Sequence, residues 1–217
     1  MDNEISIEST RGDTLRLARH HRDALAVFRQ HGGMLRTAAA RRAGVNPATL
    51  YALRDAGLLE RVTRGLYRLT EAESLSNPDL ATVAAKVPEA VVCLISALDF
   101  HDLTTQIPHK VYIALRQGSH SPRMERPPVQ AIYVTGPCFS AGVEVHELDG
   151  VPVRIYSAEK TLVDCFKHRK KIGLDVALEA LRLYRQRGRA NVPELLQHAR
   201  TCRVSRVMRP YLEALLT

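Results

Sequence analysis

Residues 36–69 constrain the fold more than any other part of the chain, because they carry the pattern of a helix-turn-helix followed by a β-hairpin wing. Two short helices that cross at a tight turn leave room only for a small residue at their contact, and Ala40 occupies that position. The turn needs a residue that tolerates positive φ, which Gly44 supplies. The second helix must bury one face, and three apolar residues have the required spacing: Val45, Leu50 and Leu53. This combination is typical of proteins that bind DNA.

The start of the second helix predicts which side chains face the bases. Pro47 suits the first helical position, where its missing N–H has no helical partner. Asn46 has two possible roles, since its amide can pair with an adenine or its oxygen can cap the helix. Ala48 and Ala52 can contact thymine methyl groups. Tyr51 either donates to a phosphate or packs partly buried against the wing.

Basic residues surround this helix and suggest contacts with the phosphate backbone. Arg64 lies at the predicted wing tip, where it can enter a minor groove. Asp55 is expected to orient an arginine rather than to touch DNA. The full set of predicted phosphate and wing contacts is Arg36, Thr37, Arg41, Arg42, Arg54, Arg61, Arg64 and Arg68.

The net charge of +8 is concentrated on the same segment. Residues 16–70 contain eleven arginines, no lysine and three acids, a balance of +8. The chain from residue 71 onward contributes +3, and the acidic leader 1–15 contributes −3. A positive field of this kind favours a polyanion, because every neutralised phosphate releases condensed counterions. A high-GC genome would raise the arginine content without explaining why the positive excess is confined to one segment.

The fold class predicted from these patterns is α+β, with two domains. After a leader over 1–13, residues 14–70 form the winged helix-turn-helix. Its expected parts are an amphipathic helix over 14–30, a strand at Met34–Leu35, helices over 38–43 and 47–56 with Thr37 as an N-cap, and wing strands Leu59–Val62 and Leu66–Leu69 around Gly65. A polar linker covers 71–79.

Residues 80–217 are predicted to form a mixed α/β domain that ends in a helical bundle. Helical patterns over 79–87 and 92–103 precede the strands Lys110–Leu115, Val129–Val134, Val143–Leu148 and Val151–Tyr156. Asp149-Gly150 signals a hairpin between the last two strands. The final helices are expected over 158–169, 174–187, 192–201 and 204–216, with Asn191 and Glu194 as a capping box.

Enzymatic and metal-binding motifs are missing from this domain. No phosphate-binding loop, nucleophile elbow or paired catalytic carboxylates occur, so we expect neither an enzyme nor a cofactor. The nine histidines lack the spacing of metal ligands, and Asp164 with His168 is interpreted as a surface pair. Four scattered cysteines predict unpaired thiols in a reducing cytoplasm. No secretory signal or membrane span is recognised.

A second basic patch follows the helix that begins after Ser157. Its members are Lys167, Arg169, Lys170 and Lys171. These cations either stabilise the negative end of the helix or bind a second polyanion.

Three segments resemble the AbiEi antitoxins of type IV toxin–antitoxin systems. They are the wing sequence 57–69, the segment Cys93–Leu103 with His101-Asp102-Leu103, and Tyr156–Asp164 with Tyr-Ser-Ala-Glu-Lys-Thr-Leu-Val-Asp. They occur in matching order over essentially the whole chain after about residue 20.

The resemblance implies a repressor that binds double-stranded DNA at inverted repeats in its own promoter. It also implies a C-terminal domain that counteracts a nucleotidyltransferase toxin without forming a stable complex. The chain would then act as a monomer, or as a weak dimer that pairs on DNA. The alternatives are a stand-alone regulator whose C-terminal domain senses a ligand or protein, and a regulator that carries a degenerate enzyme domain.

Overall fold

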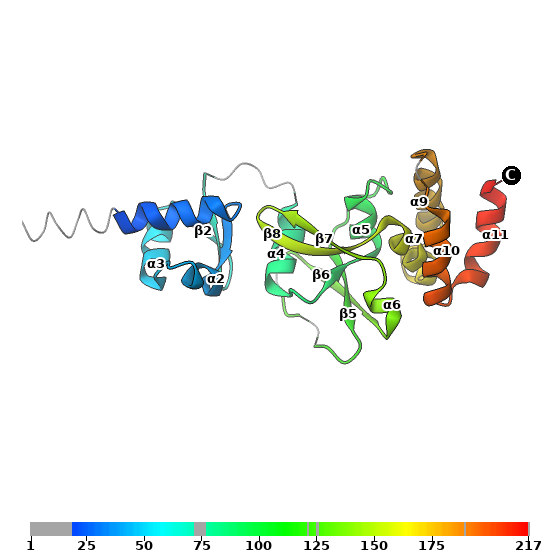
Figure 1. Cartoon of the computed structure of the whole chain (residues 1–217), viewed down its shortest axis with the longest axis horizontal. Helices are drawn as coiled ribbons and strands as arrows, with labels where there is room; N and C mark the ends of the chain where they lie inside the picture. Colours follow the sequence, from blue (N-terminus) through cyan, green and yellow to red (C-terminus); the bar gives the residue numbers. More distant parts are fainter. Residues whose placement is uncertain (1–18, 72–76, 121, 125, 189, 217) are drawn as a thin grey trace, which may run out of the picture. The chain divides into compact units, whose positions relative to one another are not determined.

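The computed structural model describes residues 19–71, 77–120, 122–124, 126–188 and 190–216. The chain divides into two compact units. The first comprises Met1–Ala85 with Glu147–Val151, and the second comprises Lys86–His146 with Pro152–Thr217. Both units contain helices and strands (Figure 1). Within the described residues, no helix combines the length and apolar character needed to cross a membrane.

The first unit contains a winged helix-turn-helix. A helix over residues 19–30 precedes β1 (Met34–Arg36), α2 (Thr37–Arg42), α3 (Pro47–Asp55), β2 (Leu59–Thr63) and β3 (Leu66–Leu69). The three strands form an antiparallel sheet in the order β1-β3-β2. The predicted strand at Met34–Leu35 is therefore confirmed as a part of the wing sheet. Residues 14–18 of the first predicted helix lie outside the described residues.

Two local details differ from the prediction. The helix expected over 38–43 begins one residue earlier, and Arg36 is its N-cap residue without a side-chain cap. Thr37 is therefore not an N-cap; its hydroxyl instead donates to the carbonyl of Gly65 in the wing turn. The wing strand β2 extends to Thr63, and its register shifts between Arg61 and Thr63.

An apolar core joins the helices of this unit to the wing. Phe28 from the first helix packs with Leu50 and Leu53 of α3 and with Leu59 and Tyr67 of the wing. All five side chains are buried. At about 25 cal/mol per Å² of apolar surface, such burial is the main favourable term in holding the domain together. The helix α4 (Pro78–Lys86) follows in the same unit over most of its length.

The C-terminal half contains a five-stranded mixed sheet in the order β6-β5-β4-β8-β7. Its strands are β4 (Val91–Val92), β5 (Val111–Arg116), β6 (Val129–Val134), β7 (Val143–Leu148) and β8 (Val151–Tyr156). The β5–β6 and β4–β8 pairs are parallel and the β4–β5 pair is antiparallel. Between β7 and β8, Asp149 and Gly150 both have positive φ, which suits a two-residue hairpin turn.

Helices cover one end of this sheet. They are α5 (Leu94–Phe100), α6 (Pro137–Ser140), α7 (Ala158–Lys167), α8 (Arg169–Ile172), α9 (Leu174–Gln186), α10 (Val192–Thr201) and α11 (Ser205–Leu216). α7 contacts α5, α9, α10 and α11, and in Figure 1 it lies between the sheet and the outer helices. One apolar cluster runs from Leu98 of α5 through Leu162 and Phe166 of α7 to Leu195 of α10.

The predicted α+β class is confirmed, and three of the four predicted C-terminal strands have the predicted bounds. The segment 92–103 is wrong as a single helix, because Val91–Val92 pairs in the sheet before α5 begins. The helix predicted over 158–169 ends at Lys167, and α8 follows as a separate short helix. The short helix α6 was not predicted from the sequence.

Candidate nucleic-acid interface and the buried network of the C-terminal domain

The helix-turn-helix has the geometry that its sequence predicts. Ala40 is fully buried at the helix contact, and Gly44 has a φ of 88° in the turn. Val45 N–H donates to the carbonyl of Ala40, which closes the turn at 2.9 Å. Because Leu50 and Leu53 are buried, the opposite side of α3 is left facing outward.

Small side chains dominate the outward face of α3. Ala48 is exposed and Ala52 is half-buried. Asn46 Oδ1 accepts a hydrogen bond from the backbone N–H of Ala48 at 2.9 Å, so this side chain caps the helix. Of the two roles left open for Asn46, the structure has it in the capping role.

Tyr51 is the largest side chain on this face, and it is 50% exposed. Half of this side chain is therefore accessible to a ligand such as DNA. The Arg54 guanidinium lies 5.4 Å from the ring centroid and 2.6 Å from an oxygen of Asp55. The Asp55 carboxylate raises the pKa of Arg54 through this hydrogen bond and its charge. Asp55 thus orients an arginine, and Arg54 is held beside Tyr51.

Exposed arginines also occur on other elements of the winged helix-turn-helix. Arg64 lies at the tip of the wing, beside Gly65 with its φ of 77°. Five of the predicted phosphate-contacting side chains are exposed: Arg36, Arg41, Arg42, Arg61 and Arg64.

Two members of the predicted phosphate set have other partners. Arg68 is only partly exposed and forms an ion pair with Glu60, its cross-strand neighbour in the β2–β3 register. The Thr37 hydroxyl is engaged with the Gly65 carbonyl. Both side chains therefore support the wing, and the sequence missed this because each partner lies on another element.

The comparison with known families bears on this half of the chain. Residues 22–70 match the family described as "Transcriptional regulator, AbiEi antitoxin". This segment is therefore similar to the DNA-binding part of AbiEi antitoxin regulators. The match to AbiEi proteins covers the helix-turn-helix and the wing and ends before α4. The similarity of Cys93–Leu103 and of 156–164 to AbiEi antitoxins remains a prediction. No curated protein matches the chain.

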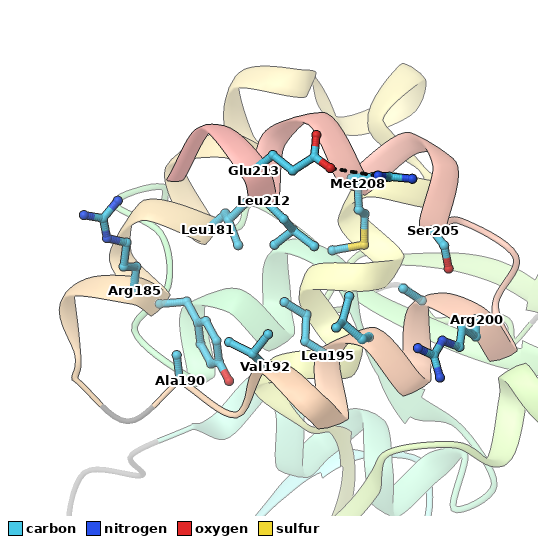
Figure 2. Close-up of a pocket in the computed structure, with 14 residues that line it drawn as sticks. Leu181, Arg185, Ala190, Val192, Leu195, Arg200, Ser205, Met208, Leu212 and Glu213 are labelled. Carbon is cyan, nitrogen blue, oxygen red and sulfur yellow. Dashed lines mark hydrogen bonds and ion pairs between the residues drawn. The ribbon is translucent and has the colours of Figure 1, made fainter. Parts of the chain in front are cut away.

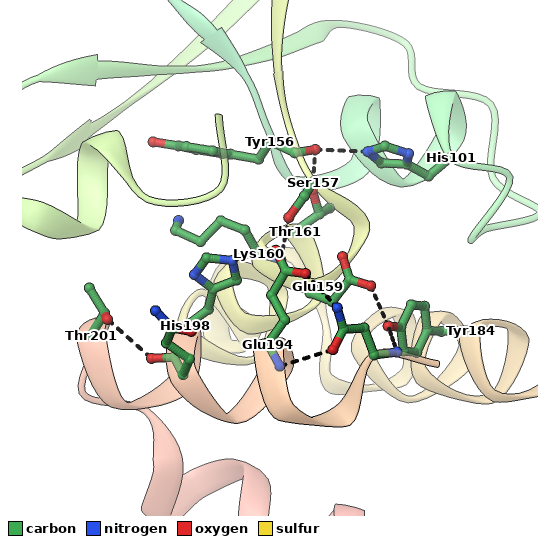
Figure 3. A network of polar contacts seen from close by, with 12 residues as sticks. His101, Tyr156, Ser157, Glu159, Lys160, Thr161, Tyr184, Glu194, His198 and Thr201 are labelled. Atoms are coloured by element: carbon green, nitrogen blue, oxygen red, sulfur yellow. Dashed lines mark hydrogen bonds and ion pairs between the residues drawn. The ribbon is translucent and has the colours of Figure 1, made fainter. Parts of the chain in front are cut away.

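The C-terminal domain contains a buried polar network that the sequence did not predict (Figure 3). Lys160 is 0% exposed and Asp164 is 1% exposed, and the Lys160 Nζ lies 2.5 Å from Asp164 Oδ2. The same ammonium lies 3.9 Å from the ring centroid of Tyr156. The predicted surface pair of Asp164 with His168 is therefore wrong, because Asp164 faces inward and pairs with Lys160.

Further hydrogen bonds fix the start of α7 within this network. Ser157 Oγ accepts from the backbone N–H of Lys160 at 3.2 Å and caps the helix. The Tyr156 carbonyl accepts from Thr161 Oγ1 at 3.2 Å and from His101 Nε2 at 2.8 Å. The Tyr156 hydroxyl donates to the Phe139 carbonyl, and burial raises the pKa of this phenol. Since the network lies beneath the surface, its clearest role is to fix α7 against the sheet.

A second, partly exposed group of hydrogen bonds lies at the start of α10. Asn191 Oδ1 accepts from the backbone N–H of Glu194, and its amide donates to the Glu194 carboxylate. The predicted capping pair of Asn191 and Glu194 is thus confirmed. The Tyr184 hydroxyl donates to Glu159 and accepts from the backbone N–H of Asn191, and burial raises the pKa of Tyr184.

The cysteines differ from the prediction of four unpaired thiols. Cys138 in α6 and Cys202 at the end of α10 form a disulfide, with their Cα atoms 5.3 Å apart. Cys93 and Cys165 are free and fully buried, and burial raises the pKa of both thiols. The pairing could not be read from spacing, because 64 residues separate the two bonded cysteines.

One cluster of metal-ligating side chains occurs among the described residues. The ligating atoms of Cys138, Cys202 and Asp164 all lie within 4.8 Å of one another. The two sulfur atoms are bonded to each other, and the carboxylate is paired with Lys160. Each donor therefore already has a partner in this structure.

The second basic patch lies where α7 ends and α8 begins. Lys167, Lys170 and Lys171 are exposed, whereas Arg169 is half-buried and donates to the carbonyl of Phe166. Arg169 therefore satisfies a backbone carbonyl in the last turn of α7 and places a cation at the negative end of this helix, as the macrodipole interpretation expects. The Lys167 ammonium lies 3.5 Å from Cys138 Sγ, and none of the three lysines has a comparable backbone role among the described contacts.

Proposed function

We propose that the chain binds double-stranded DNA through α3 and the wing, and that it represses its own operon at inverted repeats. The observation that carries this proposal is the set of exposed arginines on the elements before and after α3, within the segment that matches AbiEi regulators. Arginines of this kind bind phosphate, and a wing-tip arginine suits a minor groove.

Most of the affinity would come from the phosphate contacts. Asn46 is used as a helix cap, so Ala48, Ala52 and Tyr51 remain to read base edges. Small side chains supply few hydrogen bonds to bases, which favours modest specificity in each half-site. Two copies that pair on an inverted repeat, with half-sites spaced by multiples of about 10 bp, would compensate.

The C-terminal domain is proposed to counteract a nucleotidyltransferase toxin encoded beside this gene, without a stable complex. This part of the proposal rests on the AbiEi family match and on the resemblance of 156–164 to AbiEi antitoxins. We further propose that the domain is not an enzyme, needs no cofactor and acts in the cytoplasm. The buried position of Lys160 and Asp164 supports a structural role for the most prominent charged pair in the domain.

A second candidate is a stand-alone transcriptional regulator. The family match favours this candidate because the match is confined to residues 22–70, the segment proposed to bind DNA. In that case the C-terminal domain would sense a ligand or a protein.

DNA binding is tested by fluorescence anisotropy with a labelled fragment of the chain's own promoter and a shuffled fragment of equal length. We expect tighter binding to the promoter and a strong decrease of affinity with salt. Footprinting of the same fragment should show two protected half-sites on one DNA face. Equal affinity for both fragments at all salt concentrations would remove the repressor proposal.

Antitoxicity is tested separately by expressing the adjacent gene with and without this chain. We expect growth arrest from the adjacent gene alone and rescue by the C-terminal domain in the full chain, including in a variant that no longer binds DNA. A harmless neighbour would leave the stand-alone regulator as the better description.

A further inference from the structure

The three C-terminal helices enclose an apolar cavity of about 460 Å³ (Figure 2). Its volume falls within the roughly 300–1,000 Å³ of small-molecule sites. Side chains from α9, α10 and α11 point into the same hollow. Its apolar lining includes Leu181, Val192, Leu195, Met208 and Leu212.

The polar groups around the cavity are mostly engaged already. The Tyr184 hydroxyl is bonded to Glu159 and to the backbone of Asn191. Arg209 is paired with Glu213 at 2.7 Å. These groups therefore have little hydrogen-bonding capacity left for an incoming ligand.

Arg200 differs from them. It is exposed, it lines the cavity, and among the described residues it forms no ion pair. Ser205, the first residue of α11, lies at the same end of the cavity (Figure 2). An apolar hollow with a cation and a hydroxyl at one end is complementary to a molecule with an apolar body and one negative group.

The charge of the surrounding segment argues against a second copy of the chain as occupant. Residues 182–213 contain eight arginines and two acids. A symmetric contact between two copies of this face would bring the same arginines together, which is unfavourable. Nucleic acid has the right charge, but its backbone has no apolar part to fill the hollow.

We propose that the cavity between α9, α10 and α11 binds a small apolar carboxylic acid, with the chain of the ligand among the leucines and its carboxylate on Arg200 and Ser205. This site shares no residue with the proposed DNA-binding surface. Its test is therefore separate from the test of the proposed repressor function.

The test is isothermal titration of the full-length chain with dodecanoate, below the concentration at which the acid forms micelles, and with dodecanol as an uncharged probe of equal chain length. We expect saturable binding of one dodecanoate per chain. Arg200→Gln should weaken dodecanoate binding at least about tenfold and leave dodecanol binding unchanged, because only the acid uses the guanidinium. Arg206→Gln is the matched control, since Arg206 is an exposed arginine of α11 that does not line the cavity.

A second variant tests the cavity itself without disturbing the core. Ala190 is exposed and lines one end of the hollow, so Ala190→Trp should obstruct it and abolish dodecanoate binding while the unfolding midpoint stays unchanged. Three results would overturn the proposal: no saturable binding to the folded chain, equal loss for acid and alcohol in Arg200→Gln, or unchanged binding in Ala190→Trp. A dimer disrupted by Leu196→Asp, or an acidic peptide that binds where dodecanoate does not, would overturn it as well.

Discussion

Lys160 and Asp164 form a buried ion pair one turn apart in α7, with the Nζ and Oδ2 atoms 2.5 Å apart. Burial removes both charges from water, and the pair is stabilised by mutual attraction and by the face of the Tyr156 ring. Replacing both partners of such a pair by apolar residues changes the stability little. Removing only one partner leaves an uncompensated buried charge.

Lys160→Met should therefore reduce the free energy of unfolding by about 3–5 kcal/mol, measured by urea denaturation. The double variant Lys160→Met/Asp164→Leu should recover much of this loss, because no buried charge remains. If the double variant were less stable than Lys160→Met, an electrostatic origin of the effect would be excluded.

Arg64→Ala should weaken binding to promoter and shuffled DNA by the same factor. The plot of log K against log salt should become shallower by about one unit, because one phosphate contact is lost. The control is Arg29→Ala, which removes an arginine of the same unit that is paired with Glu71 away from the wing turn. A change of sequence preference in Arg64→Ala would instead assign this side chain to base recognition.

Asn46→Ala should cost about 0.5–2 kcal/mol of stability, because the cap on the Ala48 N–H is lost. Asn46→Ser retains an oxygen acceptor and should be nearly as stable as the wild type, with an unchanged preference among promoter variants. Ala48→Ser, in contrast, should alter that preference. A binding-site selection experiment measures both, and a changed preference in a stable Asn46→Ser protein would show that the amide reads a base.

Thiol titration of the unreduced, denatured chain should find two free thiols, and four after reduction. In the native chain Cys93 and Cys165 should react slowly, because burial keeps both thiols neutral. Cys202→Ser should destabilise the oxidised protein by about 2–4 kcal/mol. Four reactive thiols in the unreduced chain would contradict the pairing of Cys138 with Cys202.

Stability should decrease below about pH 6.5, the usual pKa of histidine. Burial lowers the pKa of both His101 and His168, so the unfolded chain binds protons that the folded chain does not. Their contribution is complete above about pH 6.5 and is lost as the pH falls through their folded pKa values. Burial raises the pKa of Asp99, which acts in the opposite sense but at more acidic pH.

The measurement is the urea midpoint at pH 7.5 and at pH 5.5. His101→Gln and His168→Gln should each reduce the difference between the two midpoints. A difference that is unaffected in the double variant would assign the pH dependence to other groups.

The sequence by itself determined those features whose physical cause is local. Gly44 adopts the positive φ that its turn requires, and Pro47 is the first residue of α3. Asp149-Gly150 turns a hairpin, and Asn191 pairs with Glu194 within one helical turn. In each case the partner lies within a few residues, so the pattern contains the whole interaction.

The tertiary structure decided the features that depend on distant partners. Cys138 forms a disulfide with Cys202, which lies 64 residues later in the chain. The Thr37 hydroxyl donates to the Gly65 carbonyl in the wing turn. The burial of Lys160 could not be predicted from the sequence, because lysines are normally exposed. The strand and the helices around α7 together create its buried environment. Burial and long-range pairing are set by the packing of several elements at once, and local patterns cannot contain that information.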